Sequence, residues 1–218
     1  MDITTVYTIL APIYDLFRPW WIAAMAREAE ECLESEILPR YLTPHTRILD
    51  LGCGTGVNLE RLLRLGLPFR TYVGLDLTPA MLARARLKGH ALTEVKGNGY
   101  CDQVRLLRGD MRRVPFSDAS FDFVLSTWAV EHVTPVKQVV CEGLRVLKPG
   151  GHLVLLCHCC PLGRWRWPLR LTEGLLLMHC PDPDDLKAEA QVMCRYFAAG
   201  LEALVLVRKP WRSYNTCK

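Results

Sequence analysis

Three glycines at alternate positions follow an apolar stretch in the first third of the chain. Residues 47–51 read Arg-Ile-Leu-Asp-Leu, and Gly52, Gly54 and Gly56 come directly after them. Glycine lets the main chain turn tightly and lets a ligand lie against backbone that carries no side chains. An ordinary turn from a strand into a helix needs one glycine rather than three. The spacing therefore predicts a ligand-binding turn.

The spacing of the glycines also separates two kinds of nucleotide ligand. Dinucleotide-binding turns have the pattern Gly-x-Gly-x-x-Gly, and Val57 stands where the third glycine of that pattern belongs. Asp50, just before the turn, repels a pyrophosphate and attracts the ammonium of an amino-acid moiety. A sulfonium nucleoside without phosphate therefore fits this turn better than a nicotinamide dinucleotide. Nicotinamide-dependent oxidoreduction remains the competing hypothesis.

Two more acids stand where apolar runs end. A carboxylate at Asp76 can accept both hydroxyls of a ribose, or it can cap the following helix, a role that Thr78 already fills. Asp110 can accept an adenine amino group while Met111 packs on the ring. The predicted cofactor site also includes Leu77, Met81 and Ser126.

These side chains need a sheet whose strands end at one common edge. Runs of β type alternate with segments of helical pattern, and they occupy residues 47–51, 71–75, 104–107, 121–126 and 152–157. The alternation predicts an α/β fold, with a doubly wound, mostly parallel, Rossmann-like sheet that has helices on both faces. Ligands bind such sheets at the carboxyl ends of the strands.

The helices have recognisable starts. An amphipathic helix is expected at residues 20–38. Thr78, Thr134 and Asp182 each precede a proline, and each is expected to cap a helix because proline needs no hydrogen-bond partner in a first turn. Residues 89–102 are rich in glycine and polar side chains, and they are expected to form a loop.

The C-terminal edge of the sheet is expected to differ. Residues 201–207 read as a sixth strand, and its antiparallel partner must be residues 214–218 or be absent. An incomplete sheet exposes unpaired backbone groups, which favours a homodimer or a covering partner at this edge.

In this order the motifs resemble those of the class I S-adenosylmethionine-dependent methyltransferases, over roughly residues 46–156. The matching segments are residues 50–56, 74–76, 109–111, 116–122 and 147–151. In that family the glycine turn lies beside the methionine part of the cofactor, the second-strand acid binds ribose and the third-strand acid binds adenine. The resemblance implies these roles for Asp50, Gly52, Gly54, Gly56, Asp76, Asp110 and Met111.

The N-terminal residues 7–15 are also similar to the Ala-x-x-Tyr-Asp motif of the quinone-biosynthesis C-methyltransferases and the bacterial phospholipid N-methyltransferases. In that group the tyrosine helps to close the cofactor pocket, which implies the same role for Tyr14. A buried aromatic residue followed by an acid near a helix N-terminus gives the same pattern.

The resemblance implies methyl transfer by in-line displacement to a small-molecule or lipid-like acceptor, which mainly requires that the two reactants be held in line. If the acceptor must lose a proton, His132 is the candidate base, because an imidazole titrates near neutrality. Alternatively His132 packs beside the cofactor without taking a proton.

Other functions remain open. Residues 157–160 read Cys-His-Cys-Cys, which suits a thiophilic acceptor such as arsenite or a thiol. A structural zinc would need Cys180 or Cys194 as well, and no metal site is predicted. A third hypothesis is a cofactor-binding module without catalysis that acts through a partner.

Size and composition set the remaining expectations. We expect one domain over residues 1–218, with an N-terminal helical part to residue 45, a cofactor-binding core at 46–158 and an acceptor-side cover at 159–218. The net charge of +4 is too mild to indicate nucleic-acid binding. Without a signal peptide or a long apolar span, the protein is expected to be cytoplasmic. Residues 164–178 interleave arginines and tryptophans before an apolar run, as in a lid, a solvated cover or a peripheral membrane contact.

Overall fold

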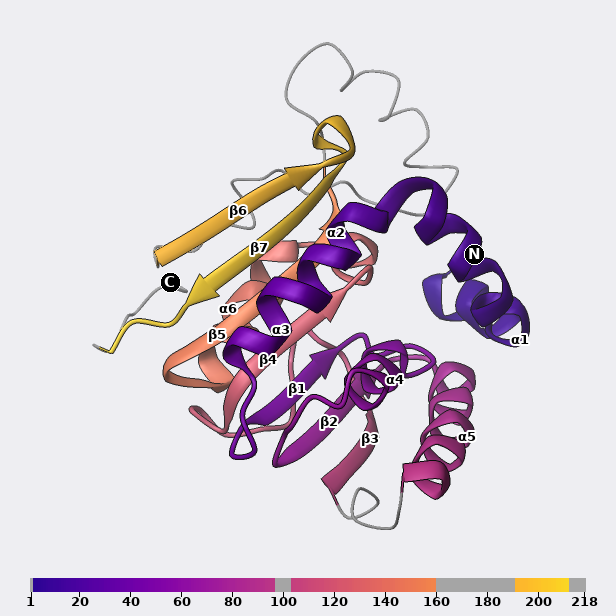
Figure 1. The fold of residues 1–218 in the computed structure, drawn as a ribbon, viewed down its shortest axis with the longest axis horizontal. Helices are drawn as coiled ribbons and strands as arrows, with labels where there is room; N and C mark the ends of the chain where they lie inside the picture. The colour runs from indigo at the N-terminus through magenta and orange to yellow at the C-terminus, as the bar shows by residue number, and fades with distance from the viewer. Residues whose placement is uncertain (1, 97–102, 160–190, 212–218) are drawn as a thin grey trace.

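Parallel β-strands form the centre of the computed structural model, which describes residues 2–96, 103–159 and 191–211 (Figure 1). The seven strands described form one sheet in the order β3-β2-β1-β4-β5-β7-β6. They are β1 (Arg47–Leu51), β2 (Thr71–Asp76), β3 (Val104–Arg108), β4 (Phe121–Thr127), β5 (Leu147–His158), β6 (Gln191–Phe197) and β7 (Glu202–Arg208). Strands β1 to β5 are mutually parallel, and β7 runs antiparallel to its neighbours β5 and β6.

Helices cover both faces of this sheet, because successive strand residues point to opposite sides. Ile48 belongs to a buried cluster with residues of α2 (Arg27–Cys32) and α4 (Val57–Arg64). Leu49 belongs to the cluster on the other face, with residues of α6 (Val136–Val146). The prediction of a doubly wound α/β fold is confirmed.

The order of the strands fixes where a ligand can bind. From β1 the chain builds outward through β2 to β3, and it then returns to place β4 on the other side of β1. The connections that follow β1 and β4 therefore diverge at their carboxyl ends. Such a switch in strand order opens a crevice between the two loops, which is where ligands bind in open α/β sheets.

The N-terminal helical region is longer than the sequence pattern predicts. It comprises α1 (Ile3–Trp21), a π-helical turn η1 (Ile22–Ala26), α2, a second π-helical turn η2 (Leu33–Ile37) and α3 (Leu38–Tyr41). Pro12 and Pro19 lie inside α1, where proline ordinarily ends a helix. Asp2 is the N-cap of α1, and its carboxylate accepts the N–H of Thr5 at 2.9 Å.

Helix α1 packs against α5 (Pro79–Lys96), at the side of the molecule away from the β6–β7 hairpin (Figure 1). Its outer surface is apolar. The large exposed side chains there are Ile9, Leu10, Ile13, Leu16, Phe17 and Trp20. Its charged residues make hydrogen bonds with other elements instead: Asp15 accepts the Thr55 hydroxyl, and Arg18 donates to Glu30 of α2.

The C-terminal edge corrects one prediction. Strand β7 corresponds to the expected strand at residues 201–207, but its antiparallel partner is β6, which precedes it in the chain. The expectation that the partner must be residues 214–218 or absent was wrong. Strand β6 shields β7, so the exposed-edge argument for a homodimer does not apply to β7.

Two local expectations were also wrong. Residues 89–96, assigned to a loop, continue helix α5, because a single glycine inside a helix costs only about 1 kcal/mol. Helix α6 has Pro135 as its N-cap with no side-chain cap, so Thr134 does not cap it. Helix α5 does begin at Pro79, directly after Thr78. The expected helix start at Asp182 lies outside the described residues.

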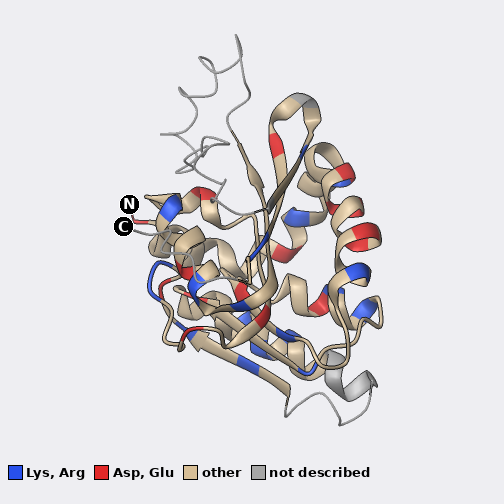
Figure 2. Ribbon diagram, turned by 90° about the vertical axis from the view of Figure 1, so that its left-hand side faces the viewer, with Lys and Arg blue, Asp and Glu red and all other residues tan. Residues whose placement is uncertain are grey.

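Charges of both signs are interspersed along the ribbon in Figure 2, as the mild net charge indicates. Among the residues described, no helix combines the length and the apolar character required to cross a bilayer. The predicted membrane contact or lid at residues 164–178 lies outside the described part of the chain and stays a prediction.

Candidate active site

A cavity of about 260 Å³ opens at the carboxyl ends of β1, β2 and β4, under the N-terminal helix α1. It lies at the switch in strand order described above. Of the residues predicted from the sequence, those that line it are Tyr14, Gly52, Gly54, Asp76, Leu77, Met81, Asp110, Met111 and His132. Residues from five separate parts of the chain thus meet in one pocket.

The glycine turn forms one wall, and its backbone conformation requires glycine. Gly52 has a φ of +74°, and a Cβ there would lie 2.4 Å from the Cβ of Ala129. The N–H groups of Gly52 and Cys53 donate to the carbonyl of Leu75 at 2.8 and 3.0 Å, which ties the turn to β2. Gly56 does not line the cavity. It starts α4 with a φ of +81°, and a Cβ there would press on Ala85 of α5.

Asp76 lies at the end of β2 with its carboxylate beside the turn. Its two oxygens accept the N–H groups of Gly54 at 2.9 Å and Thr78 at 2.8 Å. Burial raises the pKa of Asp76 above its usual value, while the N–H bonds act in the opposite direction. Each carboxylate oxygen can accept a second hydrogen bond, so Asp76 can still receive ribose hydroxyls.

Asp110 and Met111 line the cavity after β3. The Arg112 guanidinium donates to both oxygens of Asp110, at 2.6 to 3.1 Å, and holds the pKa of that carboxyl below its usual value. Met111 packs against the apolar cluster on the α6 face, and its Cε lies 2.9 Å from a Cβ built on Gly52.

Besides Gly56, two predicted residues are not brought to the cavity. Asp50 is fully buried behind the turn, where it accepts the Tyr72 hydroxyl at 2.5 Å and the Asn58 amide at 3.1 Å. Burial raises the pKa of Asp50 to about 7. Asn58 does line the cavity, so Asp50 supports the wall from behind. Ser126 is also buried and donates to the carbonyl of Leu51 at 2.6 Å, joining β4 to β1.

Helix α1 and the loop after β4 meet above the pocket. The Tyr7 hydroxyl and His132 Nε2 are 2.6 Å apart, in hydrogen-bond contact, and both side chains line the cavity. Burial raises the pKa of Tyr7 above its usual range, so its hydroxyl keeps its proton. Tyr14 packs beside Tyr7, with ring centroids 6.2 Å apart.

Comparison with known proteins decides the family. Residues 49–155, which include the glycine turn and strands β2 to β4, match the family model described as "Methyltransferase domain". This part of the chain is a class I S-adenosylmethionine-dependent methyltransferase domain.

Two curated relatives lie within this methyltransferase family. A demethylmenaquinone methyltransferase of Tropheryma whipplei (strain Twist) is 33% identical over 114 residues, which cover 52% of this chain and 42% of the relative. A ubiquinone/menaquinone biosynthesis C-methyltransferase of Dinoroseobacter shibae is 30% identical over 151 residues, covering 69% of this chain and 56% of the relative. The chain thus spans about half the length of these relatives.

Solved structures agree on the fold. A methyltransferase from Mesorhizobium loti, titled S-adenosylmethionine dependent, superposes with a TM-score of 0.60 at 23% identity, covering 83% of this chain and 99% of that one. At this level of identity the likeness supports the architecture of the methyltransferase sheet.

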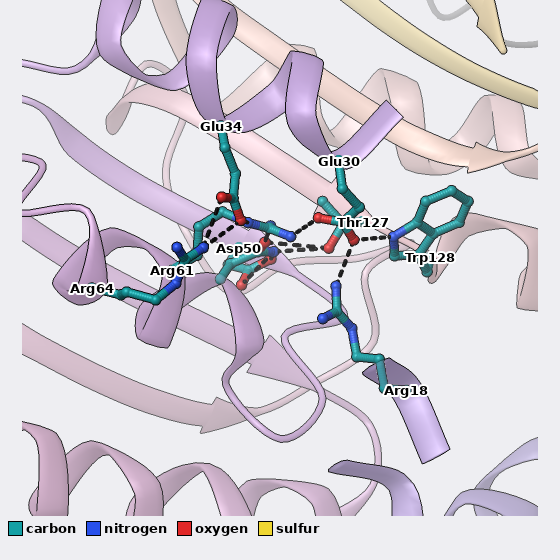
Figure 3. Close-up of polar contacts among 9 residues, drawn as sticks. Arg18, Glu30, Glu34, Asp50, Arg61, Arg64, Thr127 and Trp128 are labelled. Carbon is teal, nitrogen blue, oxygen red and sulfur yellow. Dashed lines mark hydrogen bonds and ion pairs between the residues drawn. The ribbon is translucent and has the colours of Figure 1, made fainter. Parts of the chain in front are cut away.

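The methyltransferase cavity is backed by a polar network that the sequence did not reveal (Figure 3). Glu30 of α2 accepts hydrogen bonds from Arg18 of α1 at 2.5 Å, from the Trp128 indole at 2.8 Å and from Arg61 of α4. Trp128 follows β4 with a positive φ of 55°, which is uncommon for a bulky residue. Its ring packs against Trp21 and His158, with ring centroids 4.8 and 5.1 Å away.

The two cysteines of residues 157–160 that the structure describes lie away from this pocket. Cys157 and Cys159 are buried in the apolar cluster on the α6 face, and neither lines the cavity. Cys160 lies outside the described residues. Among the described residues, no group of three His, Cys, Asp or Glu side chains is arranged to hold a metal ion.

Proposed function

We propose that this protein binds S-adenosylmethionine in the cavity and transfers its methyl group to a lipid-like acceptor of the hydroquinone class. The observation that carries the proposal is the meeting of nine predicted cofactor and catalytic residues in one pocket at the switch point of the sheet.

The pocket suits a nucleoside bound to an amino acid. Gly52 and Gly54 present bare backbone, Asp76 offers carboxylate oxygens for ribose, and Asp110 with Met111 suits an adenine ring. When bound, the cofactor supplies an electrophilic methyl group whose leaving group departs without charge. The protein must therefore exclude water and align the acceptor, and it needs no group that neutralises a leaving group.

Tyr7 and His132 together can act as the base that removes a hydroxyl proton from a hydroquinone. Methylation at a ring carbon is favoured when the hydroxyl of the ring loses its proton. A hydroxyl placed against Tyr7 Oη can give its proton to that oxygen while the Tyr7 proton moves to His132 Nε2, 2.6 Å away. Because burial disfavours a Tyr7 anion, the two transfers are expected to be concerted.

The relatives support this class of acceptor, since two of them are named for demethylmenaquinone and for ubiquinone/menaquinone C-methylation. The apolar outer surface of α1 supports a lipid-like acceptor, because large exposed apolar patches mark interaction with apolar partners. The thiophilic alternative has less support, as Cys157 is buried away from the cavity.

The proposal is tested by finding which atom of the acceptor receives the methyl group. Purified protein receives methyl-labelled S-adenosylmethionine with a panel of acceptors: a naphthohydroquinone with an isoprenoid chain, phosphatidylethanolamine, a small thiol and arsenite. We expect label on a ring carbon of the hydroquinone. His132→Gln is expected to lower kcat by about 10²- to 10⁴-fold, while the affinity for S-adenosylhomocysteine changes less than about twofold.

His45→Gln serves as the matched control, because His45 is exposed in the turn before β1. Label that appears only on nitrogen, sulfur or arsenic would contradict the acceptor class. Unchanged turnover of His132→Gln across pH would contradict the base.

A further inference from the structure

The outer surface of α1 is apolar, whereas the outer surface of a helix in a globular protein is usually polar. Its large exposed side chains recur at helical spacing, so they form one stripe along the helix. The stripe consists of Ile9, Leu10, Ile13, Leu16, Phe17 and Trp20. Phe17 is 66% exposed and Trp20 is 78% exposed. Such a stripe ordinarily packs against the core, but on α1 it faces solvent.

The polar groups of α1 lie on its inner side instead. Tyr7, Tyr14 and Arg18 line the cavity, and Asp15 accepts the Thr55 hydroxyl at 2.6 Å. Asp15 and Arg18 are the only charged residues between positions 3 and 26. The amphipathic pattern of α1 is therefore turned outward, because its polar side serves the pocket and its apolar side is exposed.

Helix α5, which packs against α1, extends this surface and adds a positive charge (Figure 1). Leu87 of α5 is 70% exposed. Arg84, about one turn earlier, donates from Nη2 to the carbonyl of Pro12 at 3.1 Å, and within the described residues no carboxylate forms an ion pair with it. Since Pro12 lies at the middle of α1, Arg84 places a cation beside the middle of the apolar stripe.

The surface of an anionic lipid bilayer fits both properties. The bilayer interface accommodates an apolar helix face with indole and phenyl rings at headgroup level, and anionic headgroups attract nearby basic side chains. The nearest exposed acids along the chain, Asp2 and Glu28, lie beyond the two ends of the stripe.

A second copy of the chain fits this surface less well. In a two-fold symmetric contact, the same patch of each copy faces its counterpart. A contact centred on the stripe would bring two Arg84 guanidiniums together, because Arg84 is bonded to the middle of α1. The charge therefore favours an anionic partner over a second copy.

We propose that α1 rests on the surface of an anionic lipid bilayer, with its stripe in the interface and Arg84 against the headgroups. The cavity lies under the same helix, so an acceptor that carries an apolar chain has a short path from the bilayer to the pocket. Binding to lipid does not require methyl transfer. It can therefore be measured independently of the proposed function.

The experiment measures co-sedimentation of the full chain with vesicles of phosphatidylglycerol and phosphatidylcholine, and with vesicles of phosphatidylcholine alone. We expect wild type to prefer the anionic vesicles and to bind them less tightly as salt rises. Trp20→Ser is expected to weaken binding about 10-fold, and Phe17→Ser/Trp20→Ser about 100-fold. Trp211→Ser is the matched control, because Trp211 is 73% exposed and lies beside Gly150, at the opposite edge of the sheet.

A second pair of variants tests the charge. Arg84→Gln is expected to bind the anionic vesicles about fivefold more weakly and the phosphatidylcholine vesicles less than about twofold more weakly. Arg70→Gln is the control, because Arg70 is an exposed arginine just before β2, at the edge of the sheet away from the cavity. Circular dichroism and thermal unfolding check that each variant is folded.

Three results would overturn the inference. The first is that wild type binds neither kind of vesicle. The second is that Phe17→Ser/Trp20→Ser binds as wild type does, or that Trp20→Ser and Trp211→Ser weaken binding equally, since another surface, such as residues 164–178, would then contact the lipid. The third is a wild-type dimer in analytical ultracentrifugation that Phe17→Ser/Trp20→Ser dissociates, since the stripe would then join two copies. If wild type binds vesicles as expected but methylates no acceptor, this inference stands and the proposed function fails.

Discussion

At the scale of single residues, the most unusual group is a buried acid beside the pocket. Glu131 is 1% exposed, and within the described residues its Oε2 has no hydrogen-bond partner. Burial raises the pKa of Glu131 to about 8, although backbone N–H groups of Glu131 and His158 act against this. The carboxyl is therefore mostly protonated at neutral pH.

This predicts how stability depends on pH. The folded pKa of Glu131 lies above the ordinary value of 4.5, so the folded state binds more protons than the unfolded one between about pH 4.5 and 8. Stability is then lost as pH rises through this window, by at most about 1.4 kcal/mol per pH unit from this group. Glu131→Gln removes the titrating group, so its stability should fall less between pH 5 and 8.

Urea unfolding of wild type and Glu131→Gln at pH 5, 6, 7 and 8 measures the difference. Glu31→Gln is the control, because Glu31 is an exposed residue of α2. Parallel pH profiles for wild type and Glu131→Gln would show that Glu131 ionises normally in the folded protein.

Residue by residue, the sequence predicted the pocket better than its surroundings. Asp76 and Asp110 are recognisable because each ends a strand, and strand ends meet at one edge. Arg18 and Trp128 were missed as a pair with Glu30, since their contacts join residues 12 and 98 positions apart. No local pattern encodes such pairings.

At the scale of elements, the turn after β1 is the most constrained piece of backbone. Gly52→Ala combines a left-handed φ of +74° with a Cβ 2.4 Å from that of Ala129. Gly66→Ala is the matched control, because Gly66 has a φ of +65° but open space around its Cβ position. We expect Gly66→Ala to lose about 1 to 2 kcal/mol and Gly52→Ala clearly more, with cofactor affinity reduced only in the latter.

Urea unfolding together with S-adenosylhomocysteine titration tests this pair. Equal losses of stability would mean that the loop after β4 moves away freely from the turn, and that the close packing at Gly52 is unimportant.

Elements with a strong local pattern were predicted well, and those with a mixed pattern were not. Strand β1 occupies the residues expected of it, because apolar residues run directly into glycine. Helix α1 was hidden by Pro12 and Pro19, which ordinarily end a helix. Strand β6 was missed because Met193, Arg195 and Phe197 do not give a clean alternation of polar and apolar residues.

At the scale of the whole molecule, the order of the strands in the sheet determines where the site lies. The order β3-β2-β1-β4-β5-β7-β6 places the ends of β1 and β4 side by side, and the N-terminal helix closes the pocket from above. The alternation of strands and helices predicts this architecture, but the proposed acceptor site also needs side chains from α1 and from the loop after β4. These side chains are far apart in the sequence and come together only in the tertiary structure.

The central claim is that this pocket takes a phosphate-free nucleoside, and calorimetric titration of the wild-type protein tests it most directly. S-adenosylmethionine and S-adenosylhomocysteine are each expected to bind one site per chain, with dissociation constants on the order of micromolar, and NAD is expected not to compete. Binding of NAD with exclusion of S-adenosylhomocysteine, or no binding of either nucleoside, would contradict it.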